Sequence, residues 1–449
     1  MREGDWSRAQ LYANRIKRLT LLARDNIDLA QFMLGFTLHP PPGGMILPNL
    51  QAVNSTAEFF QENDSSILST LFAVMHSGLT SFSIHCPTST TLIPLLAYMQ
   101  SSCAKTQEFR ISGAPLDPSS MLAKFHHLRV LSLFKSRNQT TVHLPVTVYA
   151  LQSLGSLPCL DTWESDLAFE VPLASPSPGS ESHAPFFPAL RTLKLSNIVD
   201  ICAFSDFLRR ISSLDLCDIT CHYSLTENGK NDVKEFVSAL SFHHSLQRLV
   251  LKCSAKPSQI SLFDLHGLCN LNNLRDVELS NIVSPETLTN DKLQPLLWAW
   301  RQLRTFTYRC TNYDHTRSRL NIISLVNLST KCPLLSSLSL PMNLNYPFSS
   351  VYPAHIQPER RTAPIKLIIT PSRTITRDDA SHILLAMFLT NMWPNVSLEL
   401  GALSRFYPTE NIDQLRDVNP AIAAMARVRG EERRRTIDEV NRLLDMFNW

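Results

Sequence analysis

The run Cys217-x3-Cys221-His222 is the first place in this chain where residue types and spacing could support chemistry. Thiolates and imidazole nitrogens are the preferred ligands of zinc, but a zinc site needs four of them in a tetrahedron. No second pair with suitable spacing lies nearby, and the ten cysteines of the chain are scattered along it. We therefore expect buried thiols here, with no metal and no cofactor.

Asp378 and Asp379 form a second candidate, because paired carboxylates can perform general acid–base catalysis. They open an apolar run that has the pattern of a helix, DDASHILLAMFLTNMW, where acidic residues favour the helix N-terminus. The sequence contains no phosphate-binding glycine loop, no nucleophile elbow and no H-E-x-x-H zinc motif. These observations predict a protein that is not an enzyme.

Charge and hydropathy exclude further classes of function. The formal net charge is only +3, which is too small to indicate a nucleic-acid partner. No uncharged apolar run reaches the ~18 residues that a membrane-spanning helix needs. The opening residues, MREGDWSRAQ, lack the apolar core of a secretory signal, so we expect a cytoplasmic or nuclear location.

A repeated phrase indicates the architecture that must position any functional residue. The stretches FFPALRTLKLSNI (186–198) and NNLRDVELSNI (272–282) share a Leu-Arg-x-[Leu/Val]-x-Leu-Ser-Asn-Ile pattern at an offset of 84 residues (274 − 190). Between them, ISSLDLC and SLQRLVLKC carry the same L-x-x-L-x-L frame. Central residues Leu193, Leu214, Leu249 and Val277 would then be separated by 21, 35 and 28 residues. The repeat is irregular and slightly longer than the ~20–29 residues usual for leucine-rich repeats.

Further copies extend this pattern along most of the chain, and amphipathic helical stretches precede many of them. In the stretch 230–246, for example, Val233, Phe236, Val237 and Leu240 fall on one helical face. Helix, tight turn and short strand would stack so that leucines form a continuous ladder. The predicted fold is an α/β leucine-rich-repeat-like solenoid, or horseshoe, with a parallel inner sheet and outer helices. Further copies are expected around Leu19, Phe82, Leu131, Phe306 and Leu338, with weaker ones at 49–53, 107–112, 159–164 and 365–370.

Two segments depart from the repeat. Residues 1–404 are predicted to form the solenoid, with a Pro/Ser-rich loop inserted at 172–185. In that loop Ser175 and Ser177 each precede proline and could be phosphorylated, or the loop could be passive. Residues 405–449 form an amphipathic helical tail, which we expect to cap the end of the solenoid. The alternative is a helix that binds a partner.

The concave strand face is the expected binding surface, because the residues between the leucines point outward on a rigid frame. They form a polar strip of mixed charge, which suits a target protein or peptide. The alternative is that they are ordinary solvated side chains. The predicted protein-binding residues are Thr192, Lys194, Asp215, Arg248, Lys252, Asp276, Glu278, Thr305 and Arg309.

Several segments, in order along the chain, resemble a large family of fungal F-box proteins with a leucine-rich-repeat-like C-terminal region. The first is similar to the family segment that follows the F-box, D-W-x-R-x-x-x-Y-A-x-R-[IV], and the others are similar to its strand and helix-to-strand elements. The resemblance covers roughly residues 4–400. The segments are GDWSRAQLYANRIKRLTL (4–21), MILPNLQAV (45–53), SGLTSFSI (77–84), LTNDKLQPLLWAWRQLRTFTY (288–308) and LVNLSTKCPLLSSLSLP (325–341).

This resemblance implies a function as an adaptor that presents a bound target to a Skp–cullin ubiquitin ligase. No segment of the chain resembles the F-box, so we expect Skp–cullin binding only if an F-box lies outside this chain. The alternative is a scaffold that lacks the box and has no connection to ubiquitination.

Overall fold

The structure of this protein is a computed structural model. The structure describes residues 3–21, 45–55, 68, 71–85, 89–113, 119–135, 146–169, 185–224, 230–254, 262–282, 287–310, 318–342, 365–371, 389–390, 392–393, 396–400 and 442. Three predicted features lie largely or wholly outside these residues. The first is the Pro/Ser-rich insertion at 172–185, of which only residue 185 is described. The second is the pair Asp378 and Asp379, and the third is the tail 405–449, of which only Arg442 is described.

Short parallel strands are the repeating element of the fold. Their order in the sheet follows their order in the sequence, from β1 to β14, and all the pairings whose register is defined are parallel. This topology is that of an open α/β solenoid of the leucine-rich-repeat kind, as predicted. The strands are β1 Arg18–Leu21, β2 Ala52–Ser55, β3 Ser81–His85, β4 Glu108–Ser112, β5 Val130–Phe134, β6 Thr162–Ser165, β7 Thr192–Ile198, β8 Asp218–Tyr223, β9 Arg248–Cys253, β10 Asp276–Ser280, β11 Thr305–Arg309, β12 Ser337–Met342, β13 Ile365–Pro371 and β14 Val396–Leu400.

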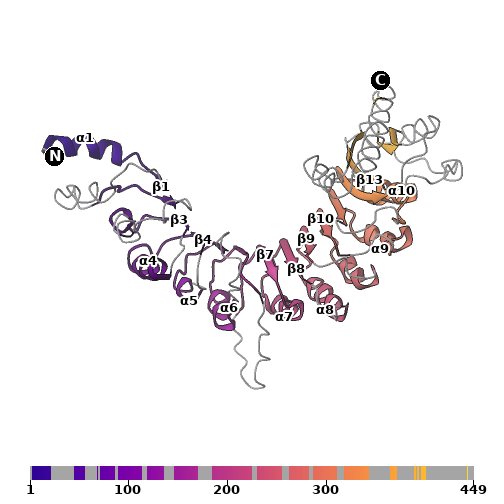
Figure 1. Cartoon of the computed structure of the whole chain (residues 1–449), viewed down its shortest axis with the longest axis horizontal. Helices are drawn as coiled ribbons and strands as arrows, with labels where there is room; N and C mark the ends of the chain where they lie inside the picture. Colours follow the sequence, from indigo (N-terminus) through magenta and orange to yellow (C-terminus); the bar gives the residue numbers. More distant parts are fainter. Residues whose placement is uncertain are drawn as a thin grey trace, which may run out of the picture. The chain divides into compact units, whose positions relative to one another are not determined.

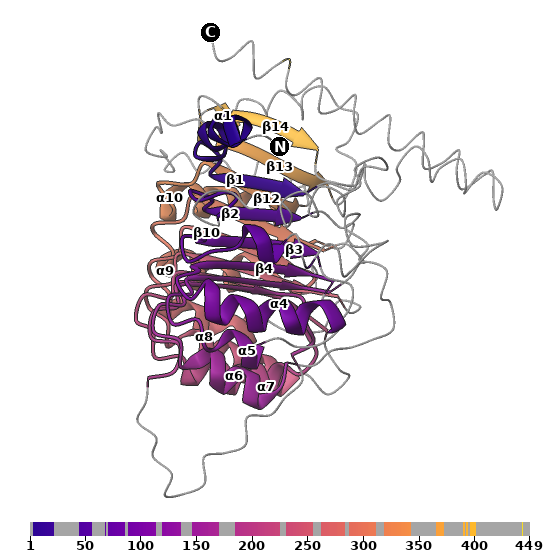
Figure 2. The ribbon, with the colours of Figure 1, turned by 90° about the vertical axis from the view of Figure 1, so that its left-hand side faces the viewer.

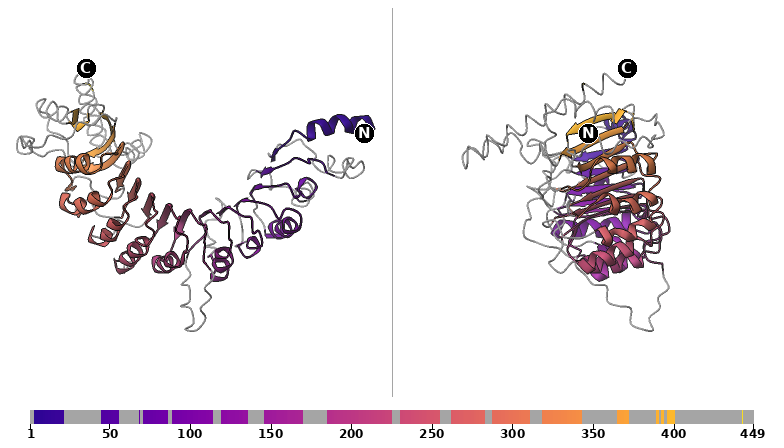
Figure 3. Two further views of the ribbon diagram at one scale, coloured as in Figure 1. Left: turned by 180° about the vertical axis from the view of Figure 1, so that it is seen from behind. Right: turned by 90° about the vertical axis from the view of Figure 1, so that its right-hand side faces the viewer.

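In the described part of the chain a helix lies between most pairs of consecutive strands, β6 and β7 excepted, and within each unit the helices lie on one side of the sheet (Figures 1 and 3). Several begin at a residue whose side chain accepts a hydrogen bond from the first turn, as Asp200 does from the Ala203 amide at 3.0 Å. The helices are α1 Glu3–Ala13, α4 Ser89–Ser102, α5 Ser119–Leu122, α6 Val148–Gly155, α7 Ile201–Arg210, α8 Lys230–Leu240, the 3-10 helix η2 Leu262–Asn270, α9 Asn290–Ala299 and α10 Ile322–Lys331.

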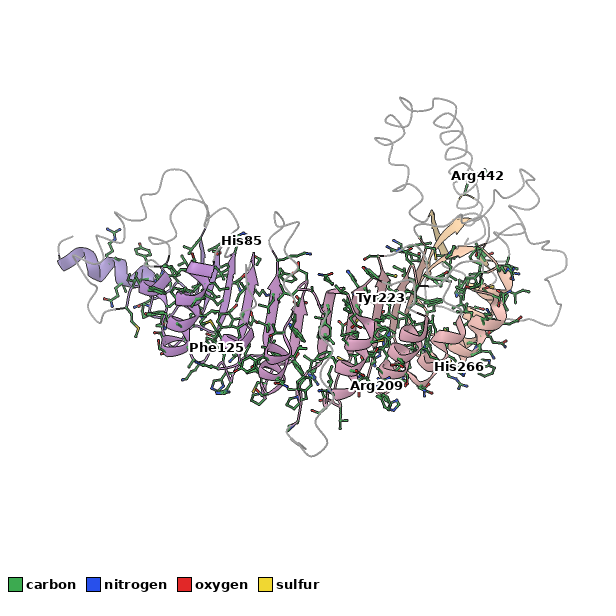
Figure 4. All side chains as sticks on the ribbon, turned by 60° about the horizontal axis from the view of Figure 1, so that its bottom comes forward. His85, Phe125, Arg209, Tyr223, His266 and Arg442 are labelled. Carbon is green, nitrogen blue, oxygen red and sulfur yellow. The ribbon has the colours of Figure 1, made fainter. Side chains whose placement is uncertain are left out.

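The chain divides into two compact units, Met1–Asp218 (unit 1) and Ile219–Trp449 (unit 2). The division falls within the repeats, at the start of β8. In unit 1, Figure 2 shows α4 to α7 on one side of the parallel strands β1 to β4. In Figure 4, His85 lies at the end of β3, whereas Phe125 lies on the helix side of unit 1. Each unit therefore has a helix side and a face of the sheet that the described helices leave uncovered, which we call the strand face.

The core of each unit is a ladder of apolar residues at alternate strand positions. In unit 2, Leu249 is in register with Val277, and Val277 is in register with Phe306, and all three are at most 1% exposed. Burial of each such side chain stabilises the fold by about 1.5–3 kcal/mol. The residues between them, such as Asp276 and Glu278, stay partly exposed on the strand face. The predicted alternation is therefore confirmed along these strands.

One register prediction is wrong. Leu214, the expected central residue of its repeat, is 87% exposed in the turn before β8. The buried positions are instead Leu216, Ile219 and Cys221, so the true frame is L-x-x-I-x-C. The amides of Cys217 and Asp218 both donate to Arg191 O, as those of Arg191 and Thr192 do to Asp161 O. With Ile219 as the central residue, the separations become 26 (219 − 193), 30 (249 − 219) and 28, which is more regular than predicted.

Two strands end in a left-handed backbone at the same position of the frame, four residues after the central core residue. Gly113 (φ 79°) follows Phe109 in β4, and Asn281 (φ 57°) follows Val277 in β10. The Gly113 amide donates to Phe134 O and the Asn281 amide to Arg309 O, each on the next strand. Glycine and asparagine are the residues that adopt this conformation at least cost, which explains their use here.

Candidate recognition surface

The strand face of unit 2 consists of three parallel rows of side chains that cross the strands. One row begins with Arg248, Asp276 and Thr305, and the next with Val250, Glu278 and Thr307. The third row, nearest the C-terminal ends of the strands, holds Lys252, Ser280 and Arg309 in register. Neighbouring strands lie about 4.8 Å apart, so Lys252 and Arg309 are about 10 Å apart along their row.

His222 extends the third row onto β8. The Asp276 amide donates to Gln247 O, the residue before its register partner Arg248. The Ser254 amide donates in the same way to Tyr223 O at 2.8 Å, so Ser254 is in register with residue 224. Two residues earlier on both strands, His222 is therefore in register with Lys252. We call His222, Lys252, Ser280 and Arg309 the basic row.

The structure places most of the predicted binding residues where the sequence analysis expected them. Arg248, Lys252, Asp276, Glu278, Thr305 and Arg309 lie on strands β9 to β11, at positions that alternate with the core. Thr192 and Lys194 lie in the same way on β7 in unit 1. The predicted surface is thus distributed over the two units. Its role in binding stays a prediction.

The prediction that Asp215 lies on a strand is wrong. It lies in the turn that precedes β8, and not on a strand. The error follows from the misplaced frame around Leu214. The positions on β8 that correspond to the strand face belong to Thr220 and His222, which the sequence analysis did not select. The alternation of Ile219, Cys221 and Tyr223, all buried, is the signal that would have found them.

An ion pair links neighbouring strands on the strand face of each unit. In unit 2, Lys252 Nζ lies 3.3 Å from Glu278 Oε1, and the Ser280 hydroxyl donates to the same oxygen at 3.4 Å. In unit 1, Lys194 Nζ lies 2.6 Å from Glu164 Oε1. Arg309, by contrast, is exposed and has no ion-pair partner among the described residues. Among the described residues, the basic row therefore contains one cation that is paired, Lys252, and one that is not, Arg309.

His222 is half-buried, and this burial lowers the pKa of its imidazole below 6.5, with the positive charge of Lys252 adding to the effect. Glu278 acts in the opposite direction and raises the same pKa. The imidazole is consequently neutral at pH 7. Lys252 and Arg309 thus supply the permanent positive charge of the basic row.

The corresponding row of unit 1 has a different character. His85, Ser112 and Phe134 are in register, and the Ser112 hydroxyl lies 3.1 Å from His85 Nδ1. Burial lowers the pKa of His85. Asp166 follows β6, and its carboxylate accepts a 2.6 Å hydrogen bond from the Lys135 amide. Burial raises the pKa of Asp166. Among the residues that the structure describes, this row carries no lysine or arginine.

The candidate zinc ligands do not converge. Cys221 is fully buried in the core, whereas the next residue, His222, points to the strand face, as alternation along a strand requires. Cys217 is partly exposed and lies 3.5 Å from Arg191 O. Among the described residues, no group of three His, Cys, Asp or Glu side chains could hold a metal ion.

The other described cysteines differ in exposure: four are buried in the core, Cys159 is exposed, and Cys202 and Cys269 are partly exposed. None of the nine forms a disulfide. Burial raises the pKa of Cys310 to about 11, although a 3.1 Å contact with the Tyr308 hydroxyl acts against the shift, and it raises the pKa of Cys103 to the same level. Such thiols are protonated at neutral pH and are poor nucleophiles.

An exposed aromatic residue lies on helix α9 of unit 2. Trp298 on α9 is 48% exposed, and Lys331 Nζ lies 3.6 Å from the centre of its ring. Arg209 of unit 1 and His266 of unit 2 also lie on the helix side (Figure 4). No helix in the described part of the chain is long and apolar enough to cross a membrane.

Comparison with known proteins gives no family assignment. No family model matches the chain, and no curated protein matches it. Among solved structures, a chain of the yeast Rad7–Elc1 complex is 12% identical, with a TM-score of 0.43 and 89% coverage of both chains. A leucine-rich-repeat protein of Leptospira interrogans is 11% identical, with a TM-score of 0.38, and the match covers 88% of this chain and 98% of that one.

Proposed function

We propose that this chain is a protein-recognition module whose strand face binds a target protein. One observation carries the proposal: a strand face that the described helices leave uncovered presents ordered rows of charged and hydroxyl side chains. A parallel sheet with a buried leucine ladder holds these side chains at fixed spacing, so little conformational entropy is lost when a partner binds. The described residues offer no grouped metal ligands for an alternative reaction site.

We further propose that the module serves as the target-binding region of an adaptor for a Skp–cullin ubiquitin ligase. The support is the resemblance of five ordered segments, from GDWSRAQLYANRIKRLTL to LVNLSTKCPLLSSLSLP, to fungal F-box proteins. In such an adaptor the F-box would bind the Skp subunit, and the solenoid would hold the target.

Affinity purification with mass spectrometry tests both levels. The 449-residue chain and the full product of its transcript are purified side by side from cells that express it naturally. Recovery of Skp and cullin subunits with the full product supports the adaptor, and the remaining proteins are its candidate targets. Recovery of specific proteins without Skp or cullin contradicts the adaptor and leaves a scaffold that lacks the box. Recovery of no specific protein in either case contradicts the recognition module itself.

A further inference from the structure

The basic row of unit 2 has a composition that specifies the chemistry of a partner. Its permanent charges, Lys252 and Arg309, are both cationic, and Ser280 lies between them in register. No acidic side chain occupies this row on β8 to β11. Glu278 lies one row away and is held by Lys252 at 3.3 Å. Its charge is thus already compensated.

Exposure shows which charges a partner meets first. Arg309, Arg248 and Lys366 are exposed, whereas Asp276 and Glu278 are partly buried. Between these cations lie five small hydroxyl residues and two partly buried acidic residues. The hydroxyl residues are Thr305, Thr307, Ser280, Ser337 and Ser339, and the acidic residues are Asp276 and Glu278. The short hydroxyl residues leave space above them for an incoming chain and supply additional hydrogen bonds.

From this arrangement we propose that the basic row receives an acidic segment of a partner protein, bound through its carboxylates. The inference rests on the proposed function, since it specifies what the strand face recognises. Arginine binds a carboxylate through two parallel hydrogen bonds, and Arg309 has no competing ion pair among the described residues. In the first row two further cations, Arg248 and Lys366, lie four strands, or about 19 Å, apart, with Asp276 between them.

An extended segment of about six residues spans the ~19 Å between Arg248 and Lys366 of the first row, since extended chains rise about 3.3 Å per residue. Alternate side chains of such a segment point to the same side, about 7 Å apart, so acidic residues there can reach both ends of the basic row. A nucleic-acid backbone is a poorer fit, because its binding depends on the neutralisation of many phosphates, and the basic row supplies only two permanent cations on β8 to β11.

The first test uses fluorescence anisotropy with a labelled hexaglutamate peptide and the full chain, at low and at physiological ionic strength. We expect Arg309→Gln and Lys252→Gln each to weaken binding about fivefold or more. Arg110→Gln is the matched control, because Arg110 is an exposed arginine on the strand face of unit 1 and its loss changes the net charge equally. It should change the affinity less than twofold. Circular dichroism and hydrogen exchange confirm that each variant is folded.

Three results would overturn the inference. The first is no measurable binding of hexaglutamate, and the second is an equal loss with Arg110→Gln, which would indicate non-specific attraction. The third is tight binding of a dT12 oligonucleotide that requires Arg309, which would assign the row to nucleic acid. The purification experiment separates this inference from the proposed function. If specific proteins are recovered equally with wild type and with Arg309→Gln, recognition stands and the acidic-segment site fails.

Discussion

The strand faces of unit 1 and unit 2 use the same backbone frame but end in different rows of side chains. In unit 1 the row nearest the C-terminal ends of the strands holds His85, Ser112 and Phe134. In unit 2 it holds the basic row with Lys252 and Arg309. Both rows contain a histidine whose pKa burial lowers. Among the described residues, only unit 2 adds a lysine and an arginine to this row.

This difference shows that the buried core residues of a repeat and its outward residues can vary independently. The leucine ladder fixes where side chains stand, because alternate strand residues must be buried. The outward residues contribute little to that burial and are therefore available to define the partner. The following experiments compare the two units, starting with the largest expected effect.

The aromatic core of unit 1 provides the largest effect. The ring of Trp163 stacks on Phe187 with centroids 5.6 Å apart and contacts Phe207 edge-on at 5.9 Å. We expect Trp163→Ala to cost about 3–5 kcal/mol in unfolding free energy, because it leaves a large cavity. Repeats contact mainly their neighbours, so hydrogen exchange should increase around β5 to β7. Increased exchange of the same size in β10 to β12 would show that the units unfold together.

The buried tryptophans of the two units differ in the hydrogen bonding of their indole nitrogens. Trp163 Nε1 is buried without a hydrogen-bond partner in the described structure, whereas Trp300 Nε1 in unit 2 donates to Leu268 O at 3.1 Å. Trp300→Phe should therefore cost about 1 kcal/mol more than Trp163→Phe, because it removes a buried hydrogen bond that Trp163 does not make, although Leu268 O still accepts from the Leu271 amide. Chemical denaturation monitored by circular dichroism measures both. A larger cost for Trp163→Phe would contradict the assignment of the hydrogen bond.

The two left-handed positions form the next comparison. Gly113→Ala should cost about 1–2 kcal/mol, because a non-glycine residue is strained at that φ. The new Cβ would also lie 2.8 Å from His85 Cε1, so the second substitution His85→Ala should recover part of the loss. Asn281→Gly, at the equivalent position of unit 2, should change stability by less than ~0.5 kcal/mol. Equal costs for Gly113→Ala and Asn281→Gly in urea titrations would contradict this account.

The two ion pairs should differ modestly. Lys194→Met removes a pair at 2.6 Å with side chains 35% and 21% exposed, and Lys252→Met removes one at 3.3 Å with side chains 39% and 25% exposed. We expect losses of about 0.5–1 kcal/mol and less than ~0.5 kcal/mol, respectively. Thermal unfolding at low and high salt checks this order. Losses that are independent of salt would show that packing, and not charge, is responsible.

The smallest effect concerns pH. The folded-state pKa of His222 is lowered, so the folded protein binds fewer protons than the unfolded chain at pH values between the two pKa values. Stability is unaffected well above pH 6.5 and decreases as the pH falls below 6.5 toward the folded pKa. His222→Asn should remove part of this decrease, which unfolding measured between pH 7.5 and pH 5.5 will show. His85→Asn gives the matched result for unit 1, since burial acts in the same direction there.

Most strands could be predicted from the sequence because the signal is local. The weaker candidates at 49–53, 107–112, 159–164 and 365–370 correspond to β2, β4, β6 and β13, and the helical face of Val233, Phe236, Val237 and Leu240 is buried. The position of the buried residues at β8 was harder to assign, because the apolar residues of ISSLDLC fit the L-x-x-L-x-L pattern in two registers. The structure selects the frame in which Leu214 is exposed and Ile219 is buried. β14 (Val396–Leu400) was not identified at all.

The alternation of core and surface residues can be read from the sequence alone, and with it the outward position of Lys252, Glu278 and Arg309, because it depends only on the two-residue period of a strand. Which of these residues are neighbours follows only from the three-dimensional packing of the repeats. The number of residues between consecutive strands varies, and parallel pairing fixes the register after the connecting helix has packed. That register brings Lys252, Ser280 and Arg309 into one row across 57 residues of sequence (309 − 252) and places His222, rather than Asp215, beside them.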